Sequence, residues 1–150
     1  MLKEKVGAQN IIVGNAISLE KIPFIKKWAL SAKNPQETMS KLRASSKLYN
    51  ESLSSEIQEL VGCNSELNVQ CLDINKILQD IYNNPRTLGL DPQLIEVPVF
   101  PWENRFDSVD KTKISELYET AKNRVWWDDS HFTSYVHKLI SDSALELFQM

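Results

Sequence analysis

The sequence predicts an α/β fold with a parallel sheet. Two short apolar segments, residues 10–13 and 67–73, favour β-strands, and a long amphipathic helix separates them. Parallel strands need a crossover connection, usually a helix and usually right-handed, so this order of elements suits a parallel pair. A chain of 150 residues corresponds to one ordinary domain or to a part of a larger one.

The composition is typical of a soluble globular protein, with 42% hydrophobic and 25% charged residues. A net charge of −3 argues against a general nucleic-acid binder, which carries a basic excess. No apolar run approaches the roughly 18 residues that span a bilayer. The first ten residues lack the apolar core of a secretory signal. The chain as it stands is therefore expected to be cytoplasmic, with no transmembrane segment and no cofactor.

The first strand is predicted at residues 10–13, which read NIIV and lie between Gly7 and Gly14. A short, β-branched run of this kind is typical of a strand that is buried on both faces of a parallel sheet. The following residues, 14–28, are polar with scattered apolar positions and contain Pro23. We expect them to form a loop.

A long helix is predicted from Pro35 to about residue 60. Asn34 is a suitable N-cap, Pro35 suits the first helical position, and Glu37 suits the first turn. Gly62 is expected to end the helix. We expect the helix to cover one face of the sheet; a coiled coil is the alternative, which Ser46 weakens. The positions that recur every three or four residues are Met39, Leu42, Ser46, Tyr49, Leu53, Ile57 and Leu60.

The second strand leads into a short helix at residues 74–82, which the polar residues and proline at 83–85 end. Residues 86–108 then form an irregular stretch with three prolines and three aromatic residues. A long loop in a compact domain is usually functional or forms the wall of a cleft. The apolar face of the short helix consists of Ile74, Ile77, Leu78 and Ile81.

Two helices are predicted in the last third of the chain. Residues 110–124 return to a helical pattern, and residues 125–127 form a very short strand or an extended turn. Thr133 or Ser134 can cap the final helix. The apolar face of that helix is predicted to contain Val136, Leu139, Ile140, Ala144, Leu147 and Phe148.

The two cysteines, Cys63 and Cys71, are eight residues apart and fit no zinc spacing. Cys71 lies in an apolar run and is expected to be a small buried residue. A disulfide between the two is expected only if the chain meets an oxidising compartment.

The candidate chemistry lies at Asp128 and His131, just before the final helix. A histidine with a nearby carboxylate is the base half of a nucleophilic triad. The carboxylate accepts the Nδ1 proton, which leaves Nε2 free to take a proton from a hydroxyl group. The structural alternative is that Asp128 and Asp129 favour the positive end of the final helix.

The second histidine, His137, is interpreted as a partly exposed residue of the final helix. A metal site built from Asp128, Asp129, His131 and His137 is not expected, because the two histidines are six residues apart rather than four.

The stretch at residues 125–141, VWWDDSHFTSYVHKLIS, resembles the last conserved block of the GDSL (SGNH) ester hydrolases. That block runs aromatic–Trp–Asp–x–x–His–Pro–Thr and continues into a helix with a second histidine. Residues 7–15, the Leu48-Tyr49-Asn50 triplet and residues 72–90 also resemble family segments, in collinear order. The residues that fall on the last block are Trp126, Trp127, Asp128, His131, Thr133 and His137.

This resemblance implies a three-layer α/β/α fold with a parallel sheet, of the SGNH-hydrolase kind. It also implies a carboxylesterase or acetylesterase activity on a small ester substrate. Asp128 would orient the ring of His131. His131 would deprotonate a serine and later protonate the leaving alcohol.

The sequence departs from the family where the nucleophile should stand. It contains no Gly-Asp-Ser block and no Gly-x-Asn-Asp block, and Phe132 occupies the place of the family's proline. Gly14-Asn15-Ala16 is an imperfect substitute, and its position matches a later strand. Residues 1–150 are therefore expected to be a single partial domain, the C-terminal part of such a hydrolase, inactive unless another chain supplies the nucleophile. The alternatives are a non-catalytic remnant and a helical interaction module that uses residues 35–60.

Overall fold

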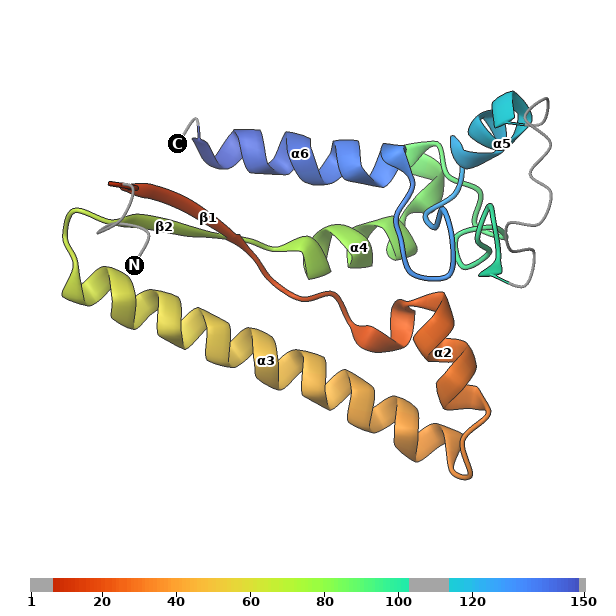
Figure 1. Cartoon of the computed structure of the whole chain (residues 1–150), viewed down its shortest axis with the longest axis horizontal. Helices are drawn as coiled ribbons and strands as arrows, with labels where there is room; N and C mark the ends of the chain where they lie inside the picture. Colours follow the sequence, from red (N-terminus) through yellow and green to blue (C-terminus); the bar gives the residue numbers. More distant parts are fainter. Residues whose placement is uncertain (1–6, 103–113, 149–150) are drawn as a thin grey trace.

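The structure, a computed structural model, describes residues 7–102 and 114–148. It is a mixed α/β fold with a small parallel sheet (Figure 1). The elements in chain order, with η for 3-10 helices, are β1 (Asn10–Gly14), η1 (Leu19–Lys21), α2 (Pro23–Leu30), α3 (Pro35–Cys63), β2 (Asn68–Leu72), α4 (Ile74–Asn83), η2 (Pro85–Leu88), α5 (Ile114–Ala121) and α6 (Ser134–Phe148).

The two predicted strands are present and pair in parallel, in a register that runs from Asn10 opposite Asn68 to Gly14 opposite Leu72. The long helix α3 lies in the connection between them, as expected for a parallel crossover. α3 and α6 lie on opposite sides of the strands (Figure 1). The prediction of an α/β fold with a parallel sheet is thus confirmed at this level.

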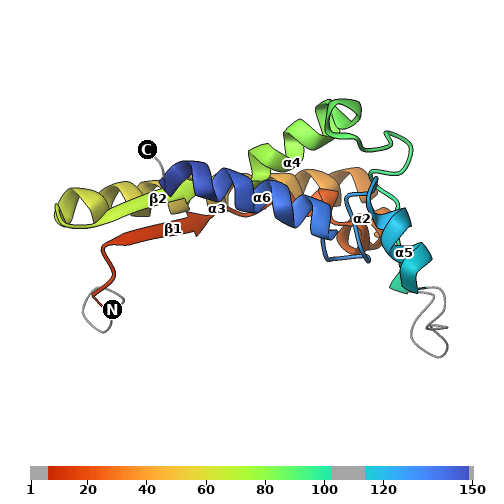
Figure 2. The same cartoon turned by 90° about the horizontal axis from the view of Figure 1, so that it is seen from above.

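The expectation that the first strand is buried on both faces is wrong. The three central residues of β1, Ile11 to Val13, are only half-buried, and its two end residues are exposed. Figure 2 shows β1 at the margin of the molecule, with β2 on its inner side. In the described part of the chain, β1 has a strand neighbour on one edge only, which leaves its apolar side chains partly open to solvent.

The expectation of a loop at residues 14–28 is also wrong, because η1 lies within that range and α2 begins in it. Pro23 is the first residue of α2, not a helix breaker. A proline suits the first turn, since the N–H that it lacks would have no helical partner there and its fixed φ is already helical.

The long helix is confirmed with adjusted details. Pro35 is its first residue, but the side chain of Asn34 donates to Glu37 (3.2 Å) and does not cap the helix. The helix ends at Cys63, one residue past Gly62. Tyr49 was predicted on the inner face and is 55% exposed, whereas the amide of the next residue, Asn50, binds the backbone of Ala16.

The later elements largely follow the sequence pattern. α4 is capped by Asp73, whose carboxylate accepts from the backbone N–H of Lys76 (2.8 Å). The helix predicted at residues 110–124 is found at Ile114–Ala121, and residues 110–113 lie outside the described residues. In the stretch predicted as irregular, η2 continues to Leu88 and residues 103–108 lie outside the described part.

The extended turn predicted at residues 125–127 is present as an isolated antiparallel bridge between Trp126 and Phe132. α6 begins at Ser134. The hydroxyl of Thr133 donates to the carbonyl of Arg124 (2.8 Å), a hydrogen bond that links the start of the helix to the preceding loop. Phe148, placed on the apolar face by the sequence, is exposed.

The main hydrophobic core lies away from the strands, where α4, α6 and the segment before the Trp126–Phe132 bridge meet. We call it the Trp126 core, and Trp126 itself has no exposed surface. Ile140 and Leu139 of α6 pack against it, as their helical spacing predicted. Its buried members are Leu78, Ile81, Leu90, Val125, Trp126 and Val136.

Cys63 and Cys71 are both free and exposed, so the expected burial of Cys71 is wrong and the disulfide is not formed. Cys71 lies in β2, whose alternation turns it towards α3 rather than into the Trp126 core. Within residues 7–102 and 114–148, no helix is both long enough and apolar enough to cross a membrane.

Candidate functional site

Asp128 and His131 form a close pair in the loop before α6. The ring Nδ1 of His131 lies 2.8 Å from Oδ2 and 3.0 Å from Oδ1 of Asp128. Oδ1 also accepts the backbone N–H groups of Ser130 and His131, each at 2.8 Å. The carboxylate therefore stabilises the turn of the loop and also binds the ring.

The pair is oriented so that one ring nitrogen of His131 is held and the other is open. The His131 side chain is 72% exposed, whereas that of Asp128 is 18% exposed. Because a carboxylate only accepts, Nδ1 carries the proton in this contact and the neutral ring keeps its lone pair on Nε2. Such a ring can accept a proton from an approaching hydroxyl group.

The electrostatics of Asp128 keep it in its ionised form. Burial alone would raise the pKa of Asp128. The N–H of Ser130, the ring and N–H of His131 and the charge of that ring outweigh the burial and hold the pKa below its ordinary value. The carboxylate thus stays negative at neutral pH and can stabilise a positively charged ring beside it.

The loop that holds the pair is closed on itself and fastened to the Trp126 core. The N–H of Trp127 donates to the carbonyl of His131 (2.8 Å), and the rings of Trp126 and Phe132 lie 4.8 Å apart. The indole N–H of Trp126 donates to the hydroxyl of Tyr82 in α4 (3.2 Å). The fully buried tryptophan thereby anchors one end of the loop.

Asp129 ties two other segments to the same loop. Its carboxylate accepts the backbone N–H of Trp102, and its carbonyl accepts the N–H of Phe24 in α2 (2.9 Å). The rings of Phe24 and Trp102 then lie 5.2 Å apart. In the described contacts, both carboxylates bind within the loop or to Trp102, and neither accepts from a backbone N–H of α6.

His137 lies on α6 as expected, exposed and edge-on to the ring of Phe132 at 6.1 Å. It does not join Asp128 and His131. Among the described residues, no group of three or more histidine, cysteine, aspartate or glutamate side chains is placed to hold a metal ion.

Within residues 7–102 and 114–148, no nucleophile is bonded to the open nitrogen of His131. No hydroxyl or thiol of the described residues forms a hydrogen bond with Nε2. Burial and the negative charge of Asp73 raise the pKa of the Cys71 thiol, which keeps it protonated and a poor nucleophile. The described residues therefore bring a carboxylate and an imidazole together, with no hydroxyl or thiol of the described residues bonded to the ring.

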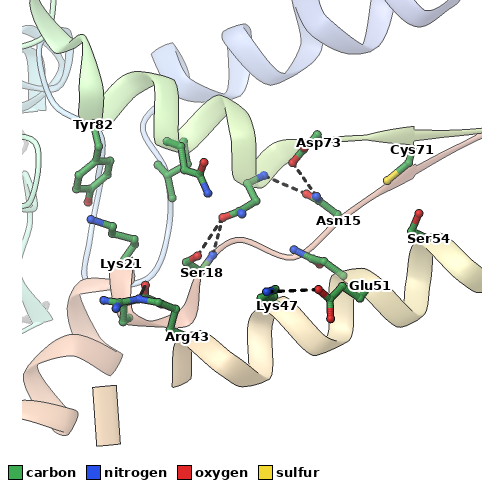
Figure 3. Close-up of a pocket in the computed structure, with 15 residues that line it drawn as sticks. Asn15, Ser18, Lys21, Arg43, Lys47, Glu51, Ser54, Cys71, Asp73 and Tyr82 are labelled. Carbon is green, nitrogen blue, oxygen red and sulfur yellow. Dashed lines mark hydrogen bonds and ion pairs between the residues drawn. The ribbon is translucent and has the colours of Figure 1, made fainter. Parts of the chain in front are cut away.

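A polar network at the carboxyl ends of the two strands was not foreseen from the sequence (Figure 3). Asn15, just after β1, donates to Asp73 (2.7 Å), just after β2, and accepts from the N–H of Asn75 (3.0 Å). Asn75 in turn accepts from the N–H and the hydroxyl of Ser18 (3.0 and 3.1 Å). The signal that was available is a polar residue at or just after the end of each strand, Asn15 for the first and Asp73 for the second.

No protein-family model matches the chain, and no curated protein matches it either. The resemblance to GDSL hydrolases therefore depends on the motif residues themselves, above all on the Trp-Asp-x-x-His block at residues 127–131.

Proposed function

We propose that Asp128 and His131 are the acid–base pair of a serine ester hydrolase of the GDSL (SGNH) type that acts on a small ester. The observation that carries the proposal is the contact of the Asp128 carboxylate with Nδ1 of His131, which leaves Nε2 open. A carboxylate that fixes the tautomer and an exposed, unengaged Nε2 are the two features that a triad base requires.

In the proposed chemistry, His131 accepts and then donates a proton, and Asp128 stabilises its charged form. As the serine oxygen bonds to the ester carbonyl carbon, its proton moves to Nε2 of His131, and Asp128 stabilises the resulting imidazolium. The same proton then passes to the departing alcohol as the bond between carbon and that alcohol breaks. Water repeats the sequence to release the acid and restore the serine.

The serine is proposed to come from a further segment, because these 150 residues contain no Gly-Asp-Ser block. The open edge of β1 supports this, since its apolar residues are only half-buried and it pairs only with β2 among the described strands. Additional parallel strands on that edge would extend the sheet between α3 and α6 into the three-layer arrangement that the resemblance implies. Strands added there would bury the half-exposed side chains of β1.

The test is complementation. The chain is co-expressed with the Gly-Asp-Ser-bearing half of a GDSL esterase, and the purified complex is assayed with p-nitrophenyl acetate. The complex should hydrolyse the ester, and His131→Ala should lower kcat by about 10³-fold or more, as expected for a triad base. The matched control is His137→Ala, which removes the other exposed histidine and should leave kcat unchanged.

Two results would contradict the proposal. One is a complex that forms, binds its ester and hydrolyses it equally well with His131→Ala. The other is an equal loss of kcat in His131→Ala and His137→Ala, because that would reveal a general effect on folding.

The interaction-module alternative has one observation in its favour. α3 carries large apolar side chains on its exposed face, which a partner helix could cover. Light scattering over a range of concentrations tests it, since a dimer formed through α3 should dissociate on dilution and on substitution of Leu48 by Glu. The exposed residues are Leu48, Tyr49, Leu60 and Val61.

A further inference from the structure

A cavity of about 690 Å³ opens between α3, α4 and the segment that contains η1 (Figure 3). It borders the polar network at the carboxyl ends of β1 and β2, since Asn15 and Asp73 line it. In open α/β sheets, ligands bind in the crevice outside the carboxyl ends of the strands. Its volume lies within the range of small-molecule sites.

The described lining holds three cations, Lys21, Arg43 and Lys47, and three carboxylates, Glu20, Glu51 and Asp73, so its formal charges balance but are unevenly placed. Arg43 is paired with Glu20 (3.0 Å) and Lys47 with Glu51 (3.6 Å). Lys21, in contrast, has no carboxylate partner in the described part of the chain, and its ammonium group lies over the ring of Tyr82, 4.3 Å from the centroid. Asp73, the lining carboxylate that forms no ion pair among the described residues, lies at the other end of the cavity beside Asn15 (Figure 3). The Lys21 end is therefore the part of the cavity suited to an anionic group.

Tyr82 adds a hydrogen-bond donor at the same end. Its oxygen accepts from the indole N–H of Trp126, and no described residue accepts its own proton. Burial raises the pKa of Tyr82 to about 12, so the phenol keeps that proton at neutral pH. Lys21 and Tyr82 face each other in Figure 3. The ammonium group of Lys21 and the hydroxyl proton of Tyr82 therefore lie together, and neither has a hydrogen-bond acceptor among the described residues.

Beyond Lys21, the lining combines the ion pairs of Arg43 and Lys47 with uncharged groups that both donate and accept. The amide of Gln79 on α4 and the hydroxyl of Ser54 on α3 line the cavity, and neither bonds to a described residue. Amides and hydroxyls suit the hydroxyl groups of a ligand, which also donate and accept. One carboxylate oxygen of the buried Glu20 likewise has no hydrogen-bond donor among the described residues.

We infer that this cavity binds a small polyhydroxylated anion, a sugar acid or a sugar phosphate. Its anionic group lies at Lys21 and Tyr82, and its hydroxyl groups lie toward Gln79 and the polar network beyond. The inference does not depend on the ester chemistry of Asp128 and His131, because none of the residues that carry it belongs to that pair.

Isothermal titration with four probes tests the ligand class: glucuronate, glucose 6-phosphate, glucose and inorganic phosphate. At least one of the two anionic sugars should bind at least tenfold more tightly than both glucose and phosphate. Which of the two binds better distinguishes a carboxylate from a phosphate ligand. Equal affinity for phosphate and both anionic sugars, equal affinity for glucose, or no saturable binding of either anionic sugar would overturn the inference.

Two variants test the position of the site. Lys21→Gln should weaken the anionic sugar at least tenfold, whereas Lys138→Gln, which removes an exposed lysine of α6 outside the cavity, should not. Lys21→Arg should retain most of the affinity, which separates loss of charge from loss of folding. In NMR spectra the indole N–H signal of Trp126 should shift on binding, because that group donates to Tyr82. An equal loss of affinity in Lys21→Gln and Lys138→Gln would overturn the assignment of the anion to Lys21.

Discussion

The Trp126 core and the strand pair of β1 and β2 bury their side chains to very different degrees. In the core, Ile81, Val125 and Trp126 have no exposed surface. In the two strands, Leu72 is the single buried residue. Parallel sheets in complete folds are covered on both faces and rarely stand as two strands. The end bearing Asp128 and His131 is thus closely packed, whereas the described strands leave most of their side chains partly or fully exposed.

The largest effect is expected at the centre of the Trp126 core. Trp126→Ala removes a fully buried indole and its bond to Tyr82, and should cost about 3–5 kcal/mol of unfolding free energy. Urea denaturation followed by circular dichroism measures this loss. A cost below 1 kcal/mol would mean that the core does not hold the fold together.

The next effect tests whether polar contacts compensate for the sparse packing near the strands. Asn50→Ala leaves the N–H and the carbonyl of Ala16 without their partners, and should cost about 1–3 kcal/mol in the same experiment. The neighbouring Tyr49→Ala is the matched control, because that side chain is mostly exposed and should change stability by about 0.5 kcal/mol or less. Equal effects would mean that the Asn50 contacts do not stabilise the fold.

A smaller effect is expected in the strand pair itself. Ile12→Ala should cost about 1 kcal/mol, well below the loss typical of a fully buried isoleucine, because Ile12 is only half-buried. The cost should rise once a partner segment pairs with β1. A loss as large as that of Trp126→Ala in the isolated chain would remove the contrast between the two regions.

The last prediction concerns pH at the Asp128 loop. The folded-state pKa of Asp128 is lowered, so its contribution to stability is present above its unfolded pKa of about 3.9 and is lost as the pH falls through the folded value. Unfolding free energy measured from pH 7 downward should therefore fall more steeply at acidic pH in the wild type than in Asp128→Asn. Identical profiles would contradict the assigned contacts.

The elements that follow from local periodicity were predictable. Apolar spacing alone gave the strands at β1 and β2 and the helices α3, α4 and α6, since each pattern is set by neighbours within one turn or one pleat. Asp128 and His131 were also accessible, because a three-residue separation within one loop brings them together without any distant contact.

The features that could not be predicted from the sequence depend on contacts between residues that are far apart along the chain. The burial of Ile12 depends on the number of strands beside β1. Whether Asn50 or Tyr49 faces inward depends on where the segment with Ala16 packs against α3. The cavity joins Lys21 to Tyr82, which are unrelated in the sequence pattern. Pro23 was wrongly taken as a sign of a loop. Proline can end one helix or begin another, and which of these occurs depends on the residues before it.

The short loop that joins Asp128 to His131 has a consequence for assembly. The ring is held by a carboxylate three residues away, and the loop is anchored by a buried tryptophan. In the proposed hydrolase, the base would therefore be preorganised before a nucleophile binds. Much of the entropy cost of aligning an acid, a base and a hydroxyl group would then be met when the chain folds. A segment that supplies a serine would need to order little more than its own side chain.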